Sequence, residues 1–230
     1  MKFRFNMFET NSSSTHEIVL TEENNTNKTL QELLKKADRK KNNNIDFYKK
    51  FILEEEYDWD NFVLTSEPKK LDYVISQILN TNWFPTLNND DDDTEQYSKS
   101  QKFIWGLFKN ILLEKLGYNI MIPIDFAKDV REIHHIDHQS IISDKISIKN
   151  SKDIITILNN LWDIVFNPKI IIVGGNDNSE DQRKLDIIIN HKGKIIKNPF
   201  TRTKGIKNIF GKYENSIDDF KKSLQKETAK

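Results

Sequence analysis

The residues with the clearest chemical potential in this chain lie in a short polar block near its start. Residues 8–16 read FETNSSSTH and place an acid, an amide, four consecutive hydroxyls and an imidazole close together. A turn between two strands normally takes Gly, Pro, Asn or Asp for its backbone angles, so these hydroxyls exceed what a turn requires. Hydroxyls and backbone amides can hold a phosphate group, and an adjacent imidazole can protonate it or bind a metal. We therefore expect a substrate-binding loop with His16 as a catalytic group, made of Glu9, Asn11, Ser12, Ser13, Ser14 and Thr15.

A plain polar loop explains the same block without any ligand. Asn11 and Ser12 can hydrogen-bond to the nearby backbone and so form side-chain turns. In addition, no helix start is obvious after Thr15, although phosphate sites commonly use the N-terminus of a helix. The sequence leaves both interpretations open, and it indicates a site without naming a reaction.

A second block, residues 131–140, holds three of the five histidines in the string REIHHIDHQS. His134, Asp137 and His138 follow the order H-x-x-D-H, which is similar to the H-x-x-E-H motif of one group of zinc peptidases. The match is poor, because Asp replaces Glu and because strand-like surroundings would not hold both histidines on one helical face. A functional interpretation makes Asp137 orient an imidazole, His138 a general base or a ligand of a divalent metal, and Ser140 a donor to the substrate. The alternative is a strand followed by a turn whose side chains cap the backbone.

The string FETNSSSTH, after a short basic and apolar strand, resembles the N-terminal signature of a group of uncharacterised proteins from phages and low-GC bacteria. Members of that group also carry a segment similar to IDHQS, which here is residues 136–140. The resemblance implies that the two blocks belong together, although it implies no activity. Glu17 stands where such strings often continue with Ser, which leaves the role of that position open. Carried over to this chain, the resemblance selects the residues of the first block named above and, in the second block, Asp137, His138, Gln139 and Ser140.

A third polar segment, GGNDNSED at residues 174–181, follows a run of apolar residues. Its glycines would allow a ligand to approach the backbone, and Asn176 and Asp177 could contact a ligand at the end of a strand. Gly and Asn are also the default residues of turns. We therefore favour a plain loop here.

Two charged segments have ordinary explanations. Residues 88–95, NNDDDDTE, lack the staggered ligands and the glycine turn of a calcium loop, so we expect a solvated loop. Residues 192–213 are locally basic and contain interleaved aromatics, a mixture that can grip phosphates and stack on bases. Lysine is common throughout the chain, however, so a solvated surface is the favoured interpretation and nucleic acid the less favoured partner.

Composition limits the class of protein. The chain has 230 residues, 35 basic and 35 acidic side chains, and no cysteine. Its balanced charge gives no overall attraction to nucleic acid or to an anionic membrane. The absence of cysteine excludes disulfides and fits a reducing cytoplasm, and no apolar run approaches the roughly 20 residues of a membrane helix. We expect a cytoplasmic protein without a membrane partner, in the host cytoplasm if a phage encodes it.

The spacing of apolar residues predicts an α+β fold, in which a mixed sheet with an N-terminal hairpin is packed by three to four amphipathic helices. We expect a single domain over residues 1–230, with a disordered acidic loop at 88–97 and a frayed tail at 226–230. The hairpin strands are 2–8 and 17–20; further strands are expected at 118–124, 130–136, 169–173, 185–189 and 194–196, and helices from 29, from 66, and over 100–116, 151–166 and 216–225.

Two functions from different classes follow from these observations. The first is an enzyme that acts on a phosphate-bearing or nucleotide-like substrate, with His16 and His138 in one pocket. The second is a non-catalytic phage or host-interaction protein that binds a protein or nucleic acid, and it predicts dispersed histidines. Clusters of hydroxyls and imidazoles are hard to justify as structure alone, so we favour the enzyme.

Overall fold

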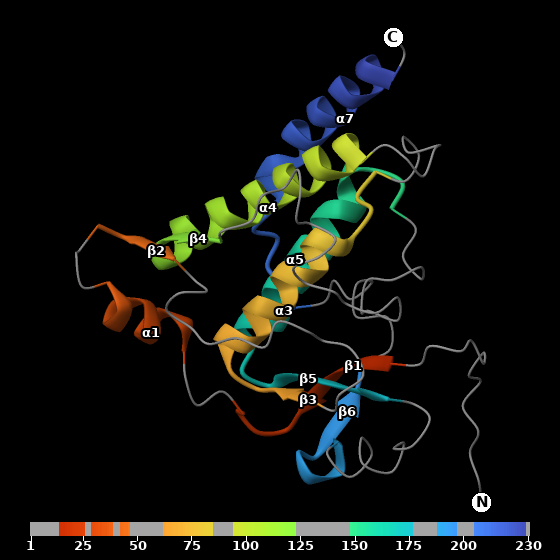
Figure 1. Ribbon diagram of the computed structural model, residues 1–230. Coiled ribbons are helices and arrows are strands. Elements are labelled where there is room, and N and C mark those ends of the chain that lie inside the picture. The colour runs from red at the N-terminus through yellow and green to blue at the C-terminus, as the bar shows by residue number, and fades with distance from the viewer. Residues whose placement is uncertain are drawn as a thin grey trace, which may run out of the picture.

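The chain combines a small antiparallel sheet with a group of long helices (Figure 1). The computed structural model describes residues 14–25, 29–38, 42–46, 62–84, 94–122, 148–176, 188–196 and 205–228. The sheet has the strand order β3-β5-β1-β6, formed by β3 (Phe62–Leu64), β5 (Ile170–Asn176), β1 (Ser14–Thr21) and β6 (Gly193–Ile195). A separate parallel pair joins β2 (Asn44–Asp46) to β4 (Asn119–Met121). The predicted α+β class, with both kinds of strand pairing, is confirmed.

The helices pack on one another and on one face of the sheet. They are α1 (Leu30–Ala37), α3 (Glu67–Asn80), α4 (Thr94–Leu116), α5 (Ser151–Phe166) and α7 (Glu214–Thr228), with a short 3-10 helix at Gly211–Tyr213 before α7. In Figure 1, α3 and α5 rise together from the sheet, and α4 and α7 lie beyond them. Within the described ranges, no helix is both long enough and apolar enough to cross a membrane.

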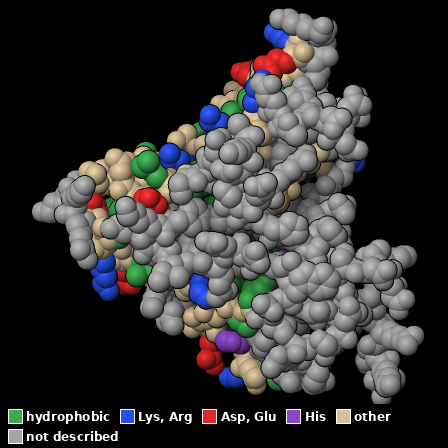
Figure 2. Space-filling view, in the orientation of Figure 1, with side chains coloured by type: hydrophobic (Ala, Val, Ile, Leu, Met, Phe, Trp, Pro, Cys, Tyr) green, Lys and Arg blue, Asp and Glu red, His purple; other side chains and the backbone are tan. Residues whose placement is uncertain are grey.

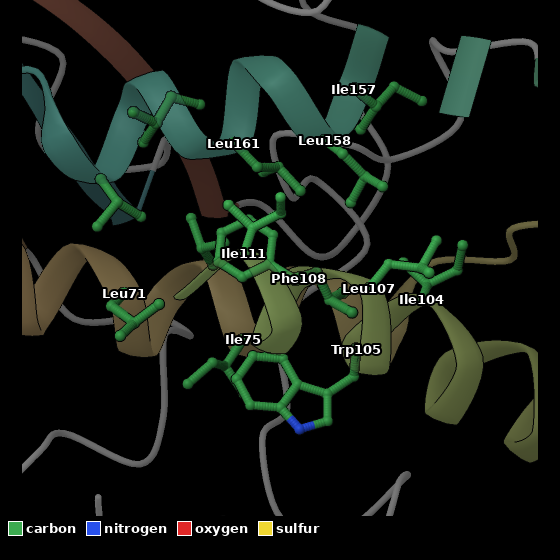
Figure 3. Packing of buried hydrophobic residues seen from close by; sticks show 14 of the residues in the cluster. Leu71, Ile75, Ile104, Trp105, Leu107, Phe108, Ile111, Ile157, Leu158 and Leu161 are labelled. Carbon is green, nitrogen blue, oxygen red and sulfur yellow. The ribbon is translucent and has the colours of Figure 1, made fainter. Parts of the chain in front are cut away.

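A single large apolar cluster lies between α3, α4 and α5 and continues to the sheet. Figure 3 shows Leu71 and Ile75 of α3, Phe108 and Ile111 of α4, and Leu161 of α5 pointing toward one another. Four of these five side chains are fully buried, and Leu161 is 1 % exposed. Burial of such side chains stabilises a fold by about 1.5–3 kcal/mol each, so this cluster is what holds α3 in place.

The sheet is apolar on both faces where its central strands pair. Ile170 and Ile172 of β5 belong to the large cluster, whereas Ile171 and Val173 form a second cluster with Val19 of β1. This alternation follows from the two-residue period of a strand. Both faces of β5 are therefore buried, as its continuous apolar sequence predicts.

Helix ends follow the capping signals in the sequence. Asn150 caps α5 in a reciprocal capping box with Asp153, and the Thr29 side chain accepts a hydrogen bond from the Glu32 N–H at the start of α1. Gly117, after α4, has φ +76°, a conformation that glycine adopts without strain. The predicted boundaries of α5 are confirmed, and those of α3 and the end of α4 agree closely with the prediction.

Several elements differ from their predicted form. Strand β5 continues through Gly174 and Gly175 to Asn176, where we expected a loop. Residues 188–190 form a helical turn and not the end of a strand, so β6 pairs with β1 instead of forming a hairpin with that segment. Helix α4 begins at Thr94, inside the predicted acidic loop, and α7 extends to Thr228, into the predicted tail. The predicted strands 2–8 and 130–136 lie outside the described residues.

Candidate functional site

The pairing of β1 with β5 brings two of the polar segments together. Ser14 lies opposite Asn176, Thr15 opposite Gly175, and His16 opposite Gly174. The end of the Ser/Thr block therefore runs beside the GGN segment at one end of the sheet. This pairing could not be predicted from the sequence, because each segment has the composition of an independent loop.

His16 sits in a buried aromatic environment just inside this end of the sheet. His16 is only 8 % exposed, and its Nδ1 lies 2.8 Å from the hydroxyl oxygen of Tyr73 on α3. The imidazole also packs edge-on against the rings of Phe62 and Tyr73, with ring centroids 5.1 and 5.5 Å away. Either the phenol donates to Nδ1 or Nδ1–H donates to the phenol oxygen, and in both cases the ring orientation is fixed.

Gly174 has a packing role at this position. A Cβ added to it would lie 2.2 Å from two carbons of the Phe62 ring, far inside a van der Waals contact. The missing side chain lets Phe62 lie across the sheet and contact His16. This explains why a glycine occupies the strand without any need for a ligand.

The polar face of α3 is buried along with its apolar face. Asp72, Tyr73 and Ser76 have no exposed surface, and Gln77 is 1 % exposed. Residues three and four apart share one face of a helix, so these side chains form a polar stripe, and the Tyr73 hydroxyl contacts His16 from it. Burying a polar group costs free energy, so buried polar side chains occur mainly in hydrogen-bonded networks and in functional sites. The candidate site is therefore the end of the β1–β5 pair together with this stripe.

Glu67 anchors the start of α3 to another helix. Its Oε2 accepts a hydrogen bond of 2.7 Å from the backbone N–H of Leu30, the first residue of α1. Burial raises the pKa of Glu67 above its usual value, opposed by that hydrogen bond and by the charge of Lys70. A carboxylate at a helix N-terminus also interacts favourably with the helix dipole.

Lys70 ties α3 to the connection between α5 and β5. Its ammonium group donates to the carbonyl oxygens of Asn167 (2.9 Å) and Ile170 (3.1 Å), and the residue is fully buried. Burial lowers the pKa of Lys70 to about 8, although the charges of Glu67 and Asp163 oppose the shift. These contacts hold α3 in register with β5, and so they place the Tyr73 side chain over β1.

The described residues contain only part of the predicted site. His16 is described in full, and Ser14 and Thr15 by their backbone. No group of three or more His, Asp or Glu that could hold a metal occurs within the described ranges. The meeting of the two sequence blocks stays a prediction, because its other members lie outside the described residues: Glu9, Asn11, Ser12, Ser13, Asp137, His138, Gln139 and Ser140.

Basic residues near the C-terminal end form part of a surface of mixed charge. Lys192 pairs with Glu23 at 3.1 Å, and Lys212 pairs with Glu114. Phe210 is fully buried and stacks on a core ring of α4, so it is not available to a nucleic-acid base. Figure 2 shows Lys and Arg side chains interspersed with acidic ones on the face in view.

No protein-family model, no curated protein and no solved structure matches this chain. Its function must therefore be inferred from its own residues. The buried His–Tyr pair at a sheet end built from two polar segments is the feature that carries this inference furthest.

Proposed function

We propose that this protein is an enzyme that acts on a phosphate-bearing or nucleotide-like small molecule at the end of the β1–β5 pair. The observation that supports the proposal is the strand register, which places the backbones of Ser14 and Thr15 beside Gly175 and Asn176, with His16 next along β1. Hydroxyls and backbone N–H groups at the end of a sheet can bind phosphate oxygens. The absence of cysteine fits a reducing compartment, and we place the enzyme in the cytoplasm.

In this proposal, His16 transfers a proton to or from the bound substrate. The hydrogen bond between Nδ1 and the Tyr73 hydroxyl fixes the orientation of the imidazole. Because His16 is buried, the transfer takes place away from bulk water, where electrostatic interactions are stronger. The sequence predicts that Asp137 orients an imidazole, that His138 is a general base or metal ligand, and that Gln139 and Ser140 contact the substrate. Their place in this site stays a prediction.

A second candidate function rests on the packing of His16. The ring lies between Phe62 and Tyr73 in the interior, which also suits a structural histidine. In that case the protein binds a protein or nucleic acid without catalysis. The two candidates differ in whether a small ligand stabilises the protein through His16.

Thermal unfolding of the full chain against a panel of phosphate compounds tests the proposal. The panel contains nucleoside mono- and triphosphates, sugar phosphates and inorganic phosphate, each with and without Mg²⁺ or Mn²⁺. A ligand at about 100 times its dissociation constant adds about 2.7 kcal/mol, which should raise the midpoint by roughly 5 to 10 °C in a protein of this size. Compounds that bind are then followed by ³¹P NMR for turnover.

The variants His16→Gln and His191→Gln separate a functional histidine from a structural one. His191 is a matched control, because its Nδ1 also hydrogen-bonds to a side chain, the Asn25 Oδ1 at 2.9 Å. We expect the ligand-induced shift to disappear in His16→Gln and to persist in His191→Gln, whatever happens to the unliganded midpoint. A shift that survives in His16→Gln, or no shift with any compound, favours the macromolecular partner.

A further inference from the structure

A groove with a volume of about 380 Å³ lies between the N-terminal half of α5 and residues 206–214. This volume is within the range of about 300–1,000 Å³ that small-molecule sites occupy. We propose that the groove binds a nucleoside monophosphate, at a site separate from the end of the β1–β5 pair. The proposal rests on the groups that line the groove and does not depend on the function of His16.

One wall of the groove is fixed by Asn159. Its Oδ1 accepts hydrogen bonds from the backbone N–H groups of Ile209 (2.8 Å) and Phe210 (3.3 Å), and its Nδ2 donates to the Asn208 Oδ1 (2.9 Å). Gly211 leaves room for the Asn208 amide, because a Cβ there would lie 2.6 Å from its Nδ2. The Asn208 side chain is thus held in one orientation before any ligand arrives, which reduces the entropy lost on binding.

Two amide groups in the groove have hydrogen-bonding capacity left over. Asn160 is 4 % exposed, and its Nδ2 donates to the Thr156 carbonyl at 2.8 Å, while none of the described residues donates to its Oδ1. The Nδ2 of Asn208 likewise has no acceptor within the described ranges. An amide oxygen that accepts and an amide nitrogen that donates can each pair with a polar group on the edge of a nucleobase. Ile155 and Ile206 also line the groove and give it an apolar part.

The charged residues of the groove suit the rest of a nucleotide. Lys152 is exposed, and its ammonium group has no acidic partner among the described residues. It lies eight residues before Asn160 on α5, which is about 12 Å along the helix axis, a span comparable with that from base edge to phosphate. Glu214 lines the groove from α7 and can accept hydrogen bonds from ribose hydroxyls, as acidic residues do in dinucleotide sites. Lys152 is then the phosphate contact.

Isothermal titration calorimetry of the full chain with AMP, GMP, CMP and UMP tests the site, with the matching nucleosides and inorganic phosphate as separate probes. Asn208→Asp keeps the oxygen that accepts from Asn159 and replaces only the donor nitrogen, so the fold is retained. Lys152→Gln removes the phosphate contact. Lys207→Gln is the matched control, because Lys207 is an exposed lysine next to the groove that does not line it.

We expect at least one monophosphate to bind, and its dissociation constant to rise about tenfold or more in Asn208→Asp and in Lys152→Gln. The control should stay within about twofold of the parent, and the nucleoside should bind more weakly than its monophosphate. His16→Gln should leave this binding unchanged, which separates it from the proposed active site. No heat from any of the four at about 1 mM, equal affinity in parent and both groove variants, or loss of binding in His16→Gln would overturn the proposal.

Discussion

Lys70 should make the stability of the protein rise with pH in the alkaline range. Burial lowers its pKa to about 8 from the ordinary 10.5, so the folded protein holds this proton less tightly than the unfolded chain. Between these two values the unfolded state binds more protons, and the free energy of unfolding therefore increases with pH. The free energy of unfolding gained through deprotonation of Lys70 is fully present above pH 10.5 and is lost as the pH falls through about 8. Below that pH, Lys70 adds no further pH dependence.

The size of the effect follows from the same two values. At 1.36 kcal/mol for each pKa unit, the difference between the folded and unfolded pKa values of Lys70 corresponds to about 3 kcal/mol, a large part of the stability of an ordinary domain. Lys70→Met keeps a long unbranched side chain but removes the titrating group. Urea unfolding followed by the fluorescence of the four tryptophans gives the free energy of unfolding of both proteins from pH 7.5 to 10.5.

The parent should gain about 3 kcal/mol relative to Lys70→Met over this range. Lys69→Met is the control, because Lys69 is the preceding lysine on the same helix and is partly exposed; it should follow the parent. A difference between parent and Lys70→Met that stays flat, or that falls with pH, would refute the reasoning that burial disfavours the Lys70 ammonium.

Three other changes test the packing and charges described above. Gly174→Ala should destabilise the protein by about 1–3 kcal/mol in urea unfolding because its Cβ meets the Phe62 ring, and the loss should shrink in a Phe62→Ala background. Tyr73→Phe should cost about 1–3 kcal/mol, because it removes the hydroxyl bonded to the buried histidine of β1; an unchanged midpoint would show that this hydrogen bond contributes nothing. The hydrogen bond from Lys212 lowers the pKa of Glu114 to about 2. The parent should therefore have a higher free energy of unfolding than Glu114→Gln at pH 4.5 and above, and this difference should disappear as the pH falls toward 2. Both groups are on the surface, so 1 M NaCl should suppress that difference, and a difference that persists in salt would contradict the assignment.

The helices could be predicted from the sequence because their signals are local. The apolar period of residues 151–166 ends at Asn167 and Pro168, and α5 ends there too. Gly174 was misread, since a glycine pair after a strand is usually a turn; here the space that it leaves is taken by Phe62, a residue more than a hundred positions earlier. No local pattern can reveal such a contact.

The candidate site was predicted in part. His16 stands out because an imidazole follows a run of hydroxyls, but Tyr73 is 57 residues away and looks like an ordinary residue of an amphipathic helix. From the sequence alone, the polar residues Asp72, Ser76 and Gln77 predict the solvent-exposed face of this helix. Its burial depends on what the rest of the chain places over it, which residue spacing within one helix does not encode.

The position of β1 in the sheet has a consequence for how the chain folds during synthesis. Both strands that flank β1 in the described sheet, β5 and β6, come from the last third of the chain, about 150 residues or more after it. At about 5–20 residues per second, a ribosome needs roughly 10 to 30 s to produce them, and during this time β5 and β6 are not yet present to pair with Ile18 and Val19. Closing so long a loop is entropically costly, so formation of the sheet should be a late step in folding.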